Sequence, residues 1–371
     1  MRFWQKSRHF IIELSHYLAK PHLLFYALPW LMVLLILGTI AQKDLGVYVA
    51  TEKYFNSFVT WMGPIPTPGG LSTIGLIFIA LTIKFIFFSP WQWKKSGTIL
   101  THLGVLLLLI GGIITALTSK EGFMIIPEGQ EINKISDYRA RVLNFYQDEQ
   151  IIKTVSFRDL KIDQVFEIDN IKIKILMTCD NCDAQAPSGQ YDNLQGLAVN
   201  MELFSIPEEK NSEVNFSGLI LSAETGKTAQ NGTYIVMEDI PKNPILKGDS
   251  GNIEIKLERA KTPLVFGIHL KDFRKIDYPG TNKAREFESD LLVQDGDLEW
   301  PVTISMNQPL RYKGYTFYQS SFDTREDKEV TVLNVVENKG RIFPYISTLI
   351  IFAGLLLHSI IRLQSYKDKA I

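Results

Sequence analysis

Residues 97–119 read GTILTHLGVLLLLIGGIITALTS, an apolar stretch that contains no Asp, Glu, Lys or Arg. A helix needs roughly 20 apolar residues to cross a bilayer, so this stretch predicts a membrane span. Residues 23–42, 71–91 and 342–361 are similarly long and apolar, and only the second of them carries a charge, Lys84 near one end. The apolar run at 23–42 is too long for a cleaved signal peptide. The sequence therefore predicts four transmembrane helices, three N-terminal and one C-terminal.

Lys and Arg are concentrated in the segments that flank these spans. The first span follows a basic N-terminal flank, Lys94 and Lys95 link the second span to the third, and Arg362 begins a basic C-terminal tail. Short positively charged segments stay in the cytoplasm, and four crossings place all three on one side. The prediction is that both termini are cytoplasmic and that the residues between the third and fourth spans lie outside.

These patterns divide the chain by composition. Residues 3–18 place apolar side chains on one helical face, which is typical of a helix in the membrane interface, and the prolines within 60–70 disfavour regular helix. The predicted parts are a cytoplasmic amphipathic segment 1–22, three spans within 23–118 with an outer loop 43–70, a β-rich extracytoplasmic domain 119–341, a fourth span 342–363 and a cytoplasmic tail 364–371.

The outer domain carries most of the charge and has the alternation of β-strands. Ile171–Leu176, Ile253–Leu257, Val302–Ser305 and Val330–Val336 alternate or are β-branched, and clusters of Gly, Asn, Asp and Pro separate them. We expect a sandwich or a related open barrel with a core of its own. A formal net charge of −1 gives no nucleic-acid footprint, and no P-loop, dinucleotide fingerprint or catalytic triad is found.

Two histidines lie inside predicted spans, His102 in the third and His358 in the fourth. The two spans run in opposite directions, so both positions fall near the cytoplasmic face at a similar depth. An ionisable residue at membrane depth is a functional candidate, and imidazole is the usual axial ligand of haem iron. The alternative is that each histidine hydrogen-bonds across a helix interface and serves packing alone. The residues by themselves leave both interpretations open.

The only cysteines, Cys179 and Cys182, form a CxxC pair in the outer domain. Such a pair can close a structural disulfide or exchange with a thioredoxin-like thiol reductant. The neighbouring Asp180 and Asp183 oppose thiolate formation, which disfavours a reactive pair. A zinc site would need two further ligands, and no His or Cys lies nearby in the sequence. Separately, residues 308–322 are dense in aromatics, which indicates either strand packing, the favoured interpretation, or an apolar docking platform.

Several of these motifs together resemble the ResB family, also called CcsB. The resemblance is carried by LGTIAQ at 37–42, PIPTPGG at 64–70, LTHLG at 100–104 with Gly111 and Gly112, and GYTFYQSS at 314–321. Each motif alone is weak, whereas their order and spacing extend over nearly the whole chain. The tryptophan-rich signature of the partner family is absent, so the chain resembles one half of a two-protein system.

The resemblance implies a function in System II cytochrome c maturation, in the bacterial inner membrane. It implies a CcsA/ResC-like membrane partner, apocytochrome c as acceptor, and haem b as a transient substrate that is attached to a CxxCH motif. By this resemblance His102 matches the family's membrane haem ligand, and His358 matches a histidine of the last span. It assigns no role to Cys179 and Cys182. A non-autonomous subunit of a haem lyase is expected rather than an enzyme complete in itself.

Overall fold

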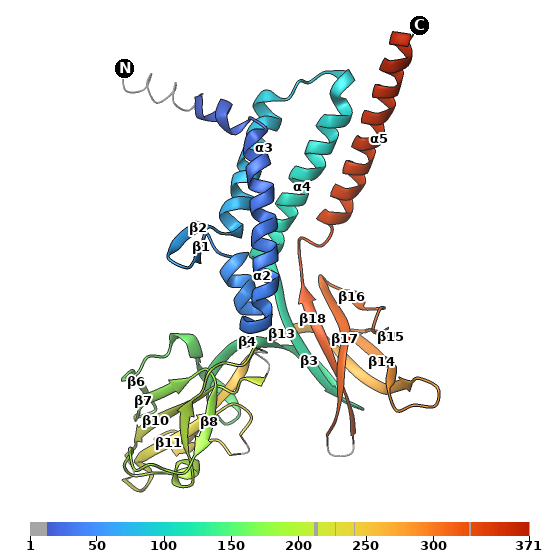
Figure 1. Ribbon diagram of the computed structural model, residues 1–371. Coiled ribbons are helices and arrows are strands. Elements are labelled where there is room, and N and C mark those ends of the chain that lie inside the picture. Colours follow the sequence, from blue (N-terminus) through green and yellow to red (C-terminus); the bar gives the residue numbers. More distant parts are fainter. Residues whose placement is uncertain (1–12, 211–213, 227, 241, 326–327, 371) are drawn as a thin grey trace. The chain divides into compact units, whose positions relative to one another are not determined.

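The computed structural model describes residues 13–370, apart from 211–213, 227, 241 and 326–327 (Figure 1). The chain divides into two compact units. One contains the residues up to Lys120 and those from Glu337 onward, and the other runs from Glu121 to Val336. Most of the amphipathic stretch predicted at 3–18 lies outside the described residues; its last part, from Glu13, is helical.

Among the described residues, the first unit contains four helices that are long and apolar enough to cross a membrane, which confirms the predicted number and order. Each contains a long apolar stretch, in which the side chains that face outward are apolar as well as those that face inward. The helices are α2 (His22–Tyr54), α3 (Gly70–Phe88), α4 (Ser96–Thr118) and α5 (Phe343–Ala370).

Helix α2 extends well past Gln42, where the sequence predicted the first span to end. A break at Gly46, with φ 77° and ψ 165°, separates its two parts. Glycine adopts this backbone conformation without a Cβ clash, and helix formation resumes after it because no proline follows before residue 64. The proline-rich run then forms a short hairpin of β1 (Val59–Met62) and β2 (Ile65–Pro68).

Helices α4 and α5 pack closely along a seam of small residues. Gly97, Gly104 and Gly111 recur every seven residues, which places them on one face of α4. A Cβ at Gly97 would overlap the backbone of His358, and a Cβ at Gly354 on α5 would lie 2.6 Å from the backbone nitrogen of Thr101 on α4. The absence of side chains therefore lets the two backbones approach each other, as small residues do in membrane helix pairs.

The second unit is made of β-sheets, as predicted. The large sheet has the strand order β15-β14-β13-β4-β3-β18-β17-β16, with β5 paired to β4 and β12 to β13; a second sheet has the order β11-β10-β7-β6, and β8 pairs with β9. Its strands are β3 (Lys120–Pro127), β4 (Glu131–Gln147), β5 (Gln150–Ser156), β6 (Val165–Ile168), β7 (Ile171–Cys179), β8 (Cys182–Gln185), β9 (Glu202–Ser205), β10 (Gly218–Glu224), β11 (Gly232–Met237), β12 (Ile245–Lys247), β13 (Asn252–Asp277), β14 (Ala284–Asp295), β15 (Leu298–Ser305), β16 (Leu310–Tyr312), β17 (Tyr315–Arg325) and β18 (Lys328–Glu337).

Two long strands, β4 and β13, contribute to two separate hydrophobic cores. Phe145 and Ile255 lie in one core with side chains of the smaller sheet. Ile135 and Ile268 lie in the other, with side chains of β14 to β17. The sandwich-like packing predicted for this region is confirmed, and its division into two cores on shared strands is a feature that the local sequence pattern did not predict.

The aromatic segment at 308–322 belongs to the second core. Phe317 is fully buried, and Tyr312, Tyr315 and Phe317 all pack around Phe266 of β13, with ring centroids 5.0–6.4 Å apart. Because these rings contact one another, they contribute to the interior of the sandwich. This packing agrees with the strand interpretation rather than with a docking platform.

Candidate functional site

His102 and His358 line the same open cavity in the helical unit. His102 lies in the second turn of α4, and His358 lies on α5. The hydroxyl oxygen of Thr98 lies 3.3 Å from Nδ1 of His358. Thr98 precedes His102 by four residues, or about 6 Å along the helix axis. The structure thus brings together the two histidines that the sequence singled out.

The glycine seam explains why His358 reaches this position. Gly97 meets the backbone of His358 directly, with no side chain between the helices. Because the backbone of His358 lies against α4 at Gly97, its imidazole reaches the side chain of the next residue, Thr98. His102 lies about one helical turn from Thr98 on the same face of α4. Both imidazoles therefore line the same cavity.

This space has a volume of about 710 Å³, within the range of roughly 300–1,000 Å³ that ligand sites occupy. Aromatic and aliphatic side chains form part of its wall, and four cationic side chains form another part. Among the described residues, no carboxylate lines it. The lining side chains include Phe88, Ile99 and Ile361, the cations Lys84, Lys94, Lys95 and Arg362, and Thr98 with the two histidines.

Lys94, Lys95 and Arg362 were predicted only as topology markers and Lys84 only as a charge near the end of its span, none of them as part of a site. Lys84 comes from α3, and Lys94 and Lys95 come from the short 3-10 helix η1 (Trp93–Lys95) between α3 and α4. A signal was present in the sequence, because these lysines flank the connection that leads directly into the His102 turn. Positive segments are so common at the cytoplasmic ends of spans that this signal alone could not identify a site.

The cavity offers the donor atoms that haem iron needs. A neutral imidazole presents one nitrogen as a ligand, and the partner of its other nitrogen sets the tautomer and the ring orientation. With Nδ1 of His358 beside the Thr98 hydroxyl, Nε2 is the nitrogen left for a metal. Within the described parts of the chain, no three His, Cys, Asp or Glu side chains are grouped to hold a metal ion by themselves.

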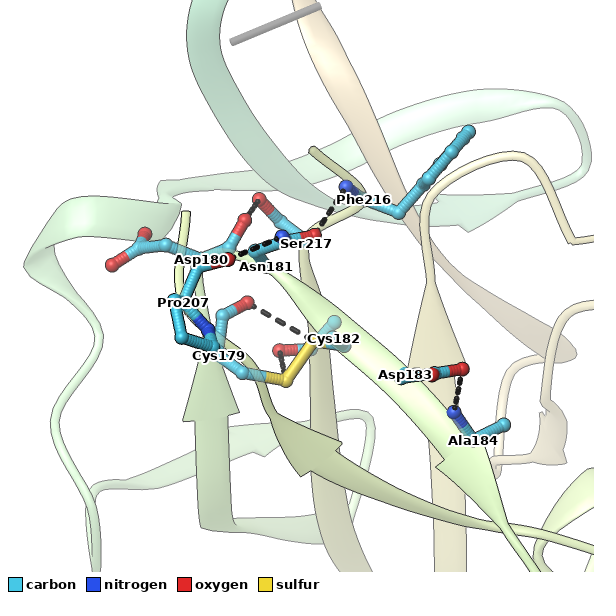
Figure 2. The surroundings of a disulfide bond; sticks show 10 residues. Cys179, Asp180, Asn181, Cys182, Asp183, Ala184, Pro207, Phe216 and Ser217 are labelled. Carbon is cyan, nitrogen blue, oxygen red and sulfur yellow. Dashed lines mark hydrogen bonds between the residues drawn. A yellow bond between two sulfur atoms is a disulfide. The ribbon is translucent and has the colours of Figure 1, made fainter. Parts of the chain in front are cut away.

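The two cysteines lie in the β unit, at the end of β7 and the start of β8. They are joined as a disulfide with their Cα atoms 5.5 Å apart, and they are only 3% and 5% exposed. Figure 2 shows the loop between the two cysteines, which forms hydrogen bonds with two neighbouring segments of the chain. Ser217 donates a hydrogen bond of 2.9 Å to the carbonyl of Asp180, and Asn181 donates one of 2.9 Å to the carbonyl of Pro207.

The surroundings of the disulfide are apolar. Both cysteines belong to a buried cluster with Leu203, Ile220 and Ile235. A thiol reductant attacks a disulfide through direct contact with one sulfur, and this burial limits such contact. The arrangement is that of a bond that closes the turn between two strands.

The sequence of the chain matches a known protein family. The sequence model of the ResB-like family matches residues 92–165 and 218–343. The first block contains Lys94, Lys95 and His102, whereas His358 lies beyond the second block and the disulfide lies between the two. His102 is therefore part of the matched sequence, and the cysteines are not.

Two curated proteins are similar to the chain. The protein NrfI of Wolinella succinogenes is 23% identical over 282 residues, which cover 75% of this chain and 29% of that protein. The cytochrome c biogenesis protein CcsB of Picosynechococcus sp. is 54% identical over 50 residues, or 13% of this chain and 11% of that protein. The chain thus spans less than a third of either relative. The resemblance predicted from the motifs is confirmed: the chain belongs to the ResB-like family.

Proposed function

We propose that this protein acts in System II cytochrome c maturation, where it binds haem within the membrane together with a CcsA/ResC-like partner. The haem is then delivered to the CxxCH motif of apocytochrome c. One observation carries the proposal: two histidines from different membrane helices line a single cavity of ligand size. Family membership and the name of the similar CcsB protein support the pathway.

His102 supplies one axial ligand to the iron. It lies within the matched family region, and its ring is partly buried in the cavity wall. The opposite ligand comes from His358 or from the partner. His358 is a candidate for this second ligand because its imidazole lines the same cavity as that of His102.

The direction of transfer follows from the distribution of charge. Lys94, Lys95 and Arg362 stand at the end of the helical unit where the cavity lies, and such segments stay cytoplasmic. Haem therefore enters from the cytoplasmic side of the bacterial inner membrane, and the β unit is extracytoplasmic. There the β unit binds the apocytochrome or stabilises the CcsA/ResC-like partner. The histidines of that partner hold the haem at the attachment site.

The chain supplies no nucleophile in this mechanism. Thioether bonds form between the haem vinyl groups and the two reduced cysteines of the CxxCH motif, so the protein's part is to hold and orient the haem. It is a subunit of a synthase rather than an enzyme by itself. The alternative within this family is a scaffold that stabilises the partner without binding haem.

The test is the absorption spectrum of the detergent-purified complex with its CcsA-like partner, compared between wild type and His102→Ala. We expect a b-type spectrum that weakens in the variant and recovers with added imidazole, while both proteins still copurify. His269→Ala is the matched control, because His269 lies on β13 outside the helices and its loss should leave the spectrum unchanged. An unchanged spectrum in His102→Ala as well would favour the scaffold.

A membrane-anchored thiol oxidoreductase is the other alternative, and the burial of Cys179 and Cys182 counts against it. A double Cys→Ser variant should mature cytochromes fully. It should lose about 2 kcal/mol of stability, the entropy of closing a very short loop, measured by denaturant unfolding. Loss of maturation without loss of stability would instead support thiol exchange at this pair.

A further inference from the structure

The cavity lined by His102 and His358 is rich in positive charge, which binding of an iron atom by the two histidines does not require. Three lysines and one arginine line it, and among the described residues no Asp or Glu does. Lys84, Lys94 and Lys95 form no ion pair within the described part of the chain. Like charges around one concavity repel each other, and an anion in their midst relieves that repulsion. The cavity is therefore suited to a negatively charged ligand.

The proposed substrate carries the matching charge. Haem is a rigid planar group with the iron at its centre, an apolar edge, and two propionate carboxylates on the opposite edge. A site for it must supply iron ligands, apolar contacts and cations on different parts of one wall. The cavity has all three kinds of contact: iron ligands in His102 and His358, apolar contacts in Phe88 and Ile361, and cations in the lysines.

We propose that Lys84, Lys94 and Lys95 bind the two propionate carboxylates of the haem, and this rests on the proposed function of the histidines. Ammonium groups act as point charges on flexible stems and need no fixed geometry to hold a carboxylate. Lys84 reaches from α3 and the other two from η1. The propionate edge accordingly faces the connection between α3 and α4, and the vinyl edge, where the thioether bonds form, points away from it.

The first experiment leaves the protein unchanged and alters the ligand. Haem-free complex is prepared from haem-depleted cells and titrated with haem and with haem dimethyl ester, in which both carboxylates are neutralised. Charge-assisted contacts contribute enough that the ester should bind about ten-fold or more weakly. Its iron should still show the histidine-ligated spectrum, because the imidazoles are untouched.

The second experiment alters the lysines. Lys94→Gln/Lys95→Gln and Lys84→Gln should each weaken the binding of haem but not that of the ester, because the ester has no carboxylate left to lose. Lys20→Gln is the control, since Lys20 also precedes an apolar helix but does not line the cavity. Lys94→Arg/Lys95→Arg keeps the charge and the topology signal and should bind haem like wild type.

The outcomes separate this inference from the function on which it rests. If haem and ester bind equally well while His102→Ala weakens both, the histidine site stands and the propionate assignment is wrong. If wild type binds neither, both fail. If the lysine variants keep haem but lose copurified phosphatidylglycerol, the cations hold lipid headgroups, and the propionate assignment is again wrong.

Discussion

The hydroxyl oxygen of Thr98 lies 3.3 Å from Nδ1 of His358, although 260 residues separate them in the chain. The whole β unit is inserted between these two positions. Folding nevertheless returns the last helix to the third one, because glycines on both helices allow a close approach there. The contact orients one of the two imidazoles that face the cavity.

Thr98→Val should weaken haem binding without preventing it. The valine keeps the shape of the side chain but removes the hydroxyl beside His358, and loss of such an orienting partner lowers metal affinity by up to about ten-fold at an exposed contact. Haem titration of the purified complex measures the effect. Thr118→Val is the control, because the Thr118 hydroxyl bonds only to the backbone of its own helix. Equal affinities in wild type and Thr98→Val would remove Thr98 from the site.

Gly104→Leu should destabilise the helical unit, and Gly112→Leu should not. A Cβ at Gly104 would lie 2.6 Å from the side chain of Ile351 and 3.0 Å from the carbonyl oxygen of Ser347, whereas nothing lies within 4 Å of a Cβ at Gly112. Overpacking of this kind costs about 1–3 kcal/mol. Thermal unfolding in detergent compares the two variants. Equal melting temperatures would mean that the seam contributes little to the packing of α4 and α5.

Glu238→Gln should strongly destabilise the β unit. The Glu238 side chain is almost fully buried and accepts charge-assisted hydrogen bonds from Arg141 on β4 and Arg259 on β13. Removing one charge of a buried cluster leaves the others uncompensated, at about 3–5 kcal/mol. Denaturant unfolding of the full chain measures this loss.

The control for Glu238→Gln is an exposed ion pair. Lys174 and Asp163 lie 2.7 Å apart with side chains 45% and 72% exposed, and such pairs contribute about 0–1 kcal/mol. Lys174→Gln should therefore leave the unfolding midpoint nearly unchanged. A comparable loss in both variants would mean that burial of the Glu238 cluster does not decide its contribution.

The phenol of Tyr146 should ionise only in strong alkali. Burial, and then a hydrogen bond donated to Glu258, raise its pKa to about 12, against about 10 for an unfolded chain. A raised pKa favours the protonated form in the folded state, so this stabilisation is complete below pH about 10 and is lost as the pH rises through about 12. The difference in phenolate absorbance between wild type and Tyr146→Phe follows this single group. A midpoint near 10 would contradict the partly buried contact with Glu258.

The sequence alone was sufficient to predict the four apolar helices and the β-rich character of the region between the third and the fourth. The four spans follow from long apolar stretches that carry at most one charge, because within a bilayer a helix satisfies its backbone polar groups internally and needs apolar side chains toward the lipid. The predicted strands Ile171–Leu176 and Ile253–Leu257 lie within β7 and β13, because alternation reports which face of a strand is buried. Both candidate histidines could be identified from the sequence because they are polar residues within apolar spans.

Tertiary structure alone decided which of these elements meet. The local sequence of β4 and β13 does not indicate that each strand contributes side chains to two cores. Strand pairing and register depend on contacts between distant segments. Likewise, Lys94 and Lys95 have the same local pattern as any cytoplasmic loop, and only the packing of α3, α4 and α5 places them in one wall with His102. Sequence determines the chemistry that each segment carries, and the close approach of distant helices determines which of those groups can act on one ligand.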